Sequence, residues 1–339
     1  MKKSRNHSID FLRIISCIAV VVIHTNYYYF KDEMSSPNLG YTYIIESLIN
    51  IAMRFSVPVF VMISGALNLS NPKNSDFQYF YKKTIKNIFL PVFIAMMFFA
   101  IFEVGFSYTM TRNLFKSIEH LLYSLLIGDF FNLWYMYMLA GLYILTPLII
   151  RLKGTISTIV YERFAIIYLC WIVFSQMFTN LEAAWSIGVV SAYLAYYILG
   201  DVICQKDFNL KLIPVIVLTG IAISISFIMR YWGLTYYLTS PYSGFFSPSI
   251  VILSVVLFSF VLKCHVSADY SKIASLSFFI YLFHTIILRF ITFVLDPYIE
   301  FNEIFKVLII TIIVLIISAI AGSLYQKLWL AFCAKFFDN

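Results

Sequence analysis

The sequence predicts an all-α, polytopic membrane protein with about ten transmembrane helices and both termini in the cytoplasm. Of its 339 residues, 61% are hydrophobic and only 12% are charged, whereas soluble domains have about 45–50% apolar and about 25% charged residues. The mean hydropathy is +0.87. A soluble fold of this length cannot bury so much apolar surface, so these values exclude an ordinary water-soluble enzyme and a disordered chain. We expect residues 1–339 to form a single transmembrane domain.

The apolar runs divide the chain into ten segments of about the length that crosses a bilayer, roughly 20 residues. The expected spans are residues 9–30, 43–69, 86–110, 130–150, 164–179, 184–203, 212–229, 245–262, 273–295 and 305–332. The run 114–128 is short and contains Glu119 and His120, so we interpret it as an interfacial or re-entrant helix. A basic start before an apolar run is also typical of a signal peptide, but Asp10 and Arg13 interrupt this run, so we interpret it as the first helix.

The orientation follows from the distribution of the 24 Lys and Arg residues. Most of them lie in loops on the side of the N-terminus; the loops on the other side hold only Lys31, Arg112, Lys116, Arg230 and Lys306. The positive-inside rule then places both termini in the cytoplasm of a bacterial-type cytoplasmic membrane. It also explains the net charge of +7, so we expect a lipid bilayer and no nucleic acid as partner. The five cysteines form no CxxC motif and no cluster, which is typical of core residues rather than of disulfides or zinc sites.

The first expected helix carries three ionisable residues on one side. An ionisable side chain at mid-membrane costs at least ~2.5–3.5 kcal/mol, so it marks a functional site by default. Arg13 and His24 are eleven residues apart, which places them on the same face of a helix, about 16 Å apart along its axis. Asp10 precedes Arg13 by three residues and can pair with it. The alternatives are an Arg13 that snorkels to the interface and a His24 that is only a core residue.

Two further helices carry ionisable residues near the midplane. Arg54 lies about 16 Å into the second span and needs an anion: Glu46, two turns earlier, or a group of the substrate. Pro58, four residues later, predicts a break in this helix, although an ordinary packing kink is the alternative. His284 lies near the midplane of the span 273–295, with Tyr281 one turn before it on the same face.

Together these residues favour proton transfer rather than metal chemistry. Histidine takes and returns a proton near neutral pH, and His24 and His284 have no obvious third ligand, so we expect no metal. Lys82, Lys83 and Lys86 precede the third span. They either follow the positive-inside rule or bind the phosphates of a cytoplasmic donor.

The pattern of these residues resembles the acyltransferase 3 family of membrane proteins. Ten residues separate Arg13 from His24, after the string Ile-Asp-Phe-Leu at 9–12, as in the opening motif of that family. The other similar segments, in order, are Phe60 with Ser64-Gly65, Lys82–Lys86 with Leu90-Pro91, Leu133-Trp134-Tyr135 with Tyr143 and Pro147, Leu199-Gly200-Asp201, and the run from Ser277 to His284. The resemblance extends over essentially the whole chain.

The resemblance implies a ten-helix O-acyltransferase. Family members usually transfer an acetyl group from cytoplasmic acetyl-CoA, the donor substrate, to a hydroxyl of an extracytoplasmic or lipid-linked cell-envelope glycan. It implies catalytic roles for His24, Arg13 and His284, and contacts of Lys82, Lys83 and Lys86 with the CoA phosphates. Arg54, Glu46, Tyr281, Ser64 and Asp10 are the candidate substrate-binding residues. One departure is that the family favours arginines in its loop motif, whereas this chain has Lys83 and Lys86, and lysine lacks the bidentate fork of arginine.

A second interpretation comes from the same resemblance. The membrane part of the serine racemases of vancomycin-resistant bacteria is also similar to this family, and it is associated with serine supply in antibiotic resistance. The chain would then bind or transport a small amino acid such as L-serine, with Arg54 and Glu46 holding its carboxylate and amine. A cytoplasmic C-terminus at Lys335–Asn339 would suit fusion to a cytoplasmic partner domain.

Overall fold

The computed structural model is all-helical over the part of the chain that it describes, which comprises residues 5–35, 41–127, 134–177, 189–206, 211–231, 244–264, 266–298 and 302–336. In this part the helices are α1 (His7–Ser35), α2 (Tyr41–Met53), α3 (Ser56–Asn68), α4 (Phe77–Thr84), α5 (Leu90–Thr111), α6 (Leu114–Ile127), α7 (Trp134–Thr155), α8 (Thr158–Met177), α9 (Val189–Gln205), α10 (Leu212–Tyr231), α12 (Pro248–Lys263), α13 (Ser271–Leu295) and α14 (Glu303–Phe336). The all-α prediction is therefore confirmed.

Eight helical segments of this part are long and apolar enough to cross a membrane: His7–Phe30, Tyr41–Asn68, Phe77–Thr109, Trp134–Thr155, Thr158–Ser175, Leu212–Met229, Ser271–Leu295 and Glu303–Lys335. Each coincides with one of the ten expected spans. The other two expected spans correspond to α9, with 17 residues, and α12, with 16. Both helices are shorter than the roughly 20 residues that span a bilayer, so a total of ten crossings stays a prediction. The start of the expected spans 130–150 and 184–203, together with Leu133, lies outside the described residues.

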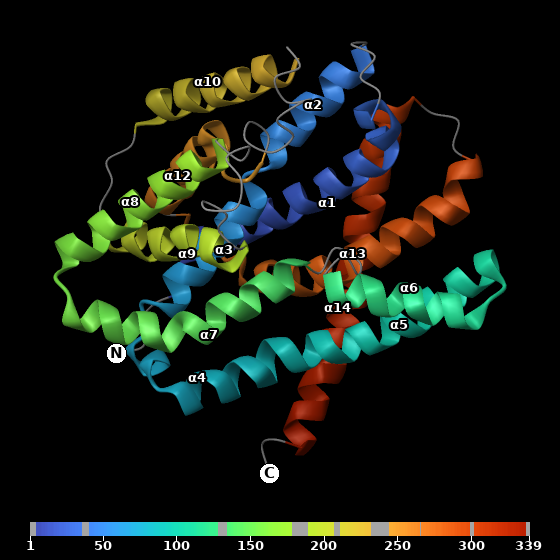
Figure 1. Cartoon of the computed structure of the whole chain (residues 1–339), viewed down its shortest axis with the longest axis horizontal. Helices are drawn as coiled ribbons and strands as arrows, with labels where there is room; N and C mark the ends of the chain where they lie inside the picture. Colours follow the sequence, from blue (N-terminus) through green and yellow to red (C-terminus); the bar gives the residue numbers. More distant parts are fainter. Residues whose placement is uncertain are drawn as a thin grey trace.

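The second expected span is two helices rather than one. α2 ends at Met53, a turn covers Arg54 and Phe55, and α3 starts at Ser56. Pro58 has no backbone N–H, so it cannot donate to the carbonyl of Arg54, and the helix ladder is interrupted at that point. The third span is also irregular, because a π-helical turn at Ile85–Phe89 joins α4 to α5. Figure 1 shows α4 and α5 as one long rod, with α6 folded back beside α5.

The two helices that carry the candidate histidines are parallel neighbours. The thiol of Cys17 in α1 donates to the carbonyl of Ser277 in α13, with 3.6 Å between sulfur and oxygen. Seven residues further along both helices, the rings of His24 and His284 lie 5.1 Å apart. The residue numbers of the contacting pairs rise together along both helices, so α1 and α13 run in the same direction.

α3 packs closely against α9 in the core of the fold. Tyr196 and Tyr197 of α9 are fully buried there. A Cβ atom on Gly65 would lie 1.8 Å from the carbonyl oxygen of Tyr197, and one on Gly200 would lie 2.0 Å from that of Met62. The two backbones therefore touch, as small residues allow in membrane helices. The sequence motifs that contain these glycines have a packing role at this crossing.

Candidate functional site

A single cavity of about 720 Å³ joins most of the ionisable residues that the sequence predicts to be functional. It lies among α1, the α2–α3 break, α7, α13 and the C-terminal part of α14. Arg13, His24, Arg54, Ser64, Tyr281 and Lys86 all line it. Arg13 and His24 therefore line the same cavity, and their roles in function stay predictions.

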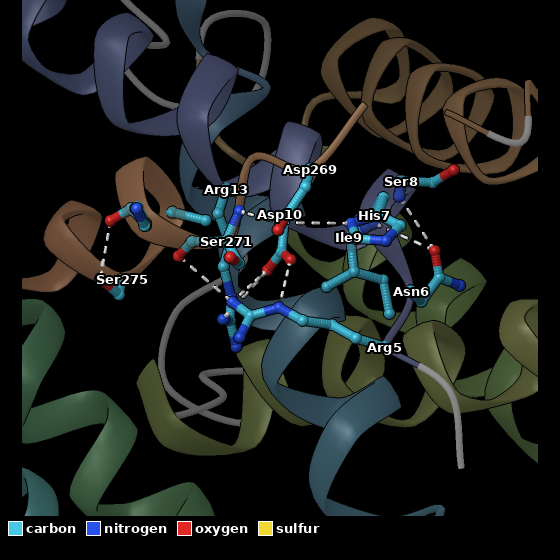
Figure 2. Close-up of polar contacts among 12 residues, drawn as sticks. Arg5, Asn6, His7, Ser8, Ile9, Asp10, Arg13, Asp269, Ser271 and Ser275 are labelled. Atoms are coloured by element: carbon cyan, nitrogen blue, oxygen red, sulfur yellow. Dashed lines mark hydrogen bonds and ion pairs between the residues drawn. The ribbon is translucent and has the colours of Figure 1, made fainter. Parts of the chain in front are cut away.

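Arg13 is held at its end of the cavity by Asp10. Its guanidinium lies 3.7 Å from the Asp10 carboxylate, which is the predicted pairing over three residues. Asp10 is buried and also accepts two hydrogen bonds from Arg5, at 2.6 and 3.1 Å. Figure 2 shows Arg5 reaching across Asp10 to the backbone carbonyl of Ser271, at 3.3 Å, at the start of α13. Arg5 thus links Asp10 of α1 to the start of α13. Asp10 itself is not among the described residues that line the cavity.

Two charged groups next to this end of the cavity, Arg5 and Asp269, keep their charge across the physiological range. The hydrogen bond with Asp10 raises the pKa of Arg5 above its ordinary value. The backbone amide of Ser271 donates to Asp269 at 2.9 Å, and hydrogen bonds from Ser271 lower the pKa of that carboxyl group. Near pH 7, Arg5 is therefore a cation and Asp269 an anion.

His24 lies half-buried in the wall of the cavity, and His284 lies behind it. His284 is buried, and its Nδ1 atom is 2.6 Å from the carbonyl oxygen of Tyr281. A carbonyl only accepts hydrogen bonds, so Nδ1 carries a proton, and in the neutral imidazole Nε2 is then an acceptor. Within the described residues Nε2 has no hydrogen-bond partner. No third His, Cys, Asp or Glu joins the two histidines in a group that could hold a metal ion within that part of the chain.

Arg54 lines the cavity from the break between α2 and α3. Its Nε atom donates to Asn50 at 2.6 Å, and its guanidinium carbon lies 5.6 Å from the centre of the Phe245 ring. Glu46, the partner that the sequence suggested, is fully buried and accepts hydrogen bonds from Asn26, at 3.4 Å, and from Ser47, at 3.3 Å. Glu46 is not among the described cavity-lining residues.

The three lysines are not equivalent. Lys86, in the π-helical turn, lines the cavity, whereas Lys82 and Lys83 are exposed on α4. Lys83 lies 5.9 Å from the centre of the Tyr79 ring. One of the three candidate phosphate contacts therefore faces the cavity, and the other two lie on the surface one turn earlier.

Several lining residues escaped sequence reasoning. Ser56 is fully buried, and its hydroxyl has no hydrogen-bond partner among the described residues. Phe245 lines the cavity beside Arg54, and Trp134 lines it next to Phe245. Gln326, Trp329 and Cys333 line it from the C-terminal part of α14. Trp134 belongs to a motif segment, but its position in the cavity depends on contacts between helices that are far apart in the sequence.

The fold and this cavity define a multi-pass membrane protein with several ionisable residues in an interior cavity. A comparison with family models matches residues 6–323 to the acyltransferase 3 family, described as an acyltransferase domain. The chain therefore belongs to that family, as its motifs indicated. No curated protein and no solved structure matches it.

Proposed function

We propose that this protein is an O-acyltransferase that moves an acetyl group from cytoplasmic acetyl-CoA to a hydroxyl of an extracytoplasmic or lipid-linked cell-envelope glycan. The observation that carries the proposal is that one cavity contains both Lys86 and Arg13, which suit an anionic donor, and His24, which suits a base. Family membership supports acyl transfer as the type of reaction. A bacterial cytoplasmic membrane is the location that this reaction and the charge distribution favour.

The donor enters, on this proposal, at the end of the cavity that carries Lys86. Lys86 and Arg13 attract the phosphates of CoA, and exposed Lys82 and Lys83 extend the positive charge outside the cavity. Because lysine binds phosphate as a point charge, this end selects for charge rather than for one fixed phosphate geometry. The thioester then points along the cavity toward His24.

His24 acts as the general base. A neutral imidazole nitrogen takes the proton of the acceptor hydroxyl while its oxygen attacks the thioester carbonyl carbon. The tetrahedral intermediate collapses by breaking the C–S bond, and the thiolate of CoA takes the proton back from His24. Atoms and charge balance: an ester and free CoA leave, and the enzyme returns to its starting state. Holding donor and acceptor in one cavity makes the encounter effectively intramolecular.

The test is transfer of labelled acetyl from acetyl-CoA to a hydroxyl-bearing acceptor by the purified protein. His24→Ala is expected to lower kcat by at least about 100-fold, the usual contribution of a general base. The matched control is His120→Ala, because the His120 side chain is 63% exposed on α6 and does not line the cavity. Turnover that survives in His24→Ala would overturn the mechanism.

A second candidate function is the binding or transport of a small amino acid such as L-serine. The position of Arg54 favours it, because an arginine at a helix break inside a membrane protein is a suitable carboxylate site. Counterflow of labelled L-serine in proteoliposomes tests it. Exchange that Arg54→Gln abolishes supports transport, and no exchange in the wild-type protein excludes it.

A further inference from the structure

The cavity wall between Arg54 and His24 is a continuous series of aromatic rings. The Phe245 ring next to Arg54 lies 5.9 Å from Trp134, and Trp134 lies 6.4 Å from Tyr135. Tyr135 lies 5.4 Å from Tyr281 and 6.4 Å from Phe60. We call Phe60, Trp134, Tyr135, Phe245 and Tyr281 the aromatic wall; all five line the cavity.

The aromatic wall reaches the histidines at its other end. The ring of Tyr281 lies 5.6 Å from that of His284, and His284 lies 5.1 Å from His24. A cation and a base thus lie at opposite ends of one apolar, ring-lined surface. Binding sites for small molecules commonly combine aromatic walls with a few convergent polar groups in this way.

Each part of this surface matches a part of a sugar. One face of a pyranose ring carries mostly C–H groups and packs against the negative face of an aromatic ring. Its hydroxyls need hydrogen-bond partners. Ser56, two residues after Arg54, is one of the lining residues, and its buried hydroxyl has no partner in the described part of the chain. An orphan polar atom in a buried wall costs free energy unless a ligand or water satisfies it.

Arg54 adds a preference for a negatively charged ligand. Its Nε atom is held by Asn50, so the orientation of the guanidinium plane is restrained. A restrained guanidinium binds carboxylate or phosphate with two parallel hydrogen bonds, a geometry that a neutral hydroxyl does not match. The low dielectric around it strengthens that preference.

We propose that the aromatic wall is the acceptor subsite, and that it takes a pyranose bearing an anionic group, a carboxylate or a phosphate, with the anion at Arg54 and a hydroxyl at His24. This inference rests on the proposed function for the identity of the acceptor. It goes beyond that function by naming the chemical class of sugar and the residues that select it.

The experiment measures binding in the absence of acetyl-CoA. Dissociation constants are determined by calorimetry, with the full chain in lipid nanodiscs, for methyl glucuronide, glucose 1-phosphate, methyl glucoside and L-serine. At least one of the two anionic sugars is expected to bind about 10-fold or more tightly than methyl glucoside, and their ranking distinguishes carboxylate from phosphate. Equal binding of the charged and neutral sugars, no sugar binding, or binding of L-serine alone would each overturn the proposal.

Two variants assign the selectivity to residues. Arg54→Gln is expected to bring the affinities for charged and neutral sugars to within about 2-fold of each other, whereas Trp134→Leu weakens binding of both by about 5-fold or more. Arg54→Lys retains the positive charge and loses the bidentate geometry of the guanidinium. It therefore tests the anion preference if the glutamine variant fails to fold. An anion preference that persists in the lysine and glutamine variants contradicts the inference.

The result separates this inference from the proposed function. Selective sugar binding without acetyl transfer in the companion assay would reject the transferase and retain the anionic-sugar subsite. Transfer to neutral and anionic sugars at equal KM would retain the transferase and reject the subsite.

Discussion

The hydrogen bond of His284 gives the two histidines different roles. Its Nδ1 proton is committed to the Tyr281 carbonyl, which leaves Nε2 as a buried acceptor beside the ring of His24. A histidine with a fixed tautomer is suited to orient a second imidazole, as carboxylates do in other base–orienter pairs. His24 lines the cavity and His284 is not among its described lining residues, so we propose that His24 transfers the proton and that His284 positions it.

We predict that His284→Phe lowers kcat by about 10- to 100-fold, the scale on which a partner group tunes a catalytic one. The phenyl ring preserves packing against Tyr281 but removes the acceptor atom. The KM values for donor and acceptor are expected to change less than about 2-fold, because His284 does not line the cavity. His284→Gln, whose amide oxygen can accept a hydrogen bond, should recover part of the rate. An increase in KM with unchanged kcat would contradict a positioning role.

Residue patterns along one helix predicted much of the site. Arg13 and His24 share a face because of helical periodicity, and both line the cavity. The same reasoning could not identify Asn26, on the neighbouring helix, as a hydrogen-bond partner of Glu46. It also could not predict that Trp134 and Phe245 line the cavity, because the residue pattern along one helix does not show which distant segment packs against it.

At the scale of elements, the crossing of α3 and α9 depends on two glycines. Each backbone passes so close to the other that no side chain fits between them. α3 starts directly after the turn that holds Arg54, so the crossing helps to position that turn. The sequence contained both glycines in recognisable motifs, but only the packed helices show that each one faces a backbone carbonyl.

We expect Gly65→Ala and Gly200→Ala each to destabilise the protein by about 3 kcal/mol or more, since overpacking against backbone cannot be relieved by a rotamer change. The matched control is Gly105→Ala in α5, where an added Cβ would contact nothing within 4 Å. That change should be neutral or stabilising by up to about 1 kcal/mol, because alanine favours the helix. Thermal unfolding in detergent measures all three. A Gly65→Ala variant as stable as the control would show that the two helices separate without cost.

The break after Met53 shows how far the sequence could predict the interruption of a helix. Pro58 predicted an irregularity, and the interruption lies four residues earlier, at the carbonyl that the proline leaves without a donor. The sequence could indicate that the helix is disturbed. It could not show that the turn presents Arg54 to a cavity, because that depends on Phe245 and on α7, which line the same cavity and are distant in the sequence.

On the scale of the whole molecule, the orientation in the membrane is open to a direct test. The charge distribution predicts that Cys264 faces the cytoplasm and Lys116 the opposite side, and both residues are exposed. A membrane-impermeant maleimide should label Lys116→Cys in intact cells. It should label Cys264 only after permeabilisation, in a variant whose other cysteines are replaced. Labelling of Cys264 in intact cells would reverse the topology and place the Lys86 end of the cavity outside.

Cys333 links this orientation to the cavity. It lies on α14, is almost fully buried, and lines the same cavity as Lys86 and His24. If the donor enters at this end, CoA should shield the thiol. In a variant that retains only Cys333, we expect saturating CoA to slow its modification by a small thiol reagent at least about 5-fold, in proportion to occupancy of the site. Lys86→Ala should weaken this protection by raising the CoA concentration required, since it removes a charge that attracts phosphate.

Cys17 is the matched control, because it is also buried but is not among the described residues that line the cavity. Equal protection of both thiols would indicate a global conformational change. No protection of Cys333 at any CoA concentration would mean that the donor does not use this cavity.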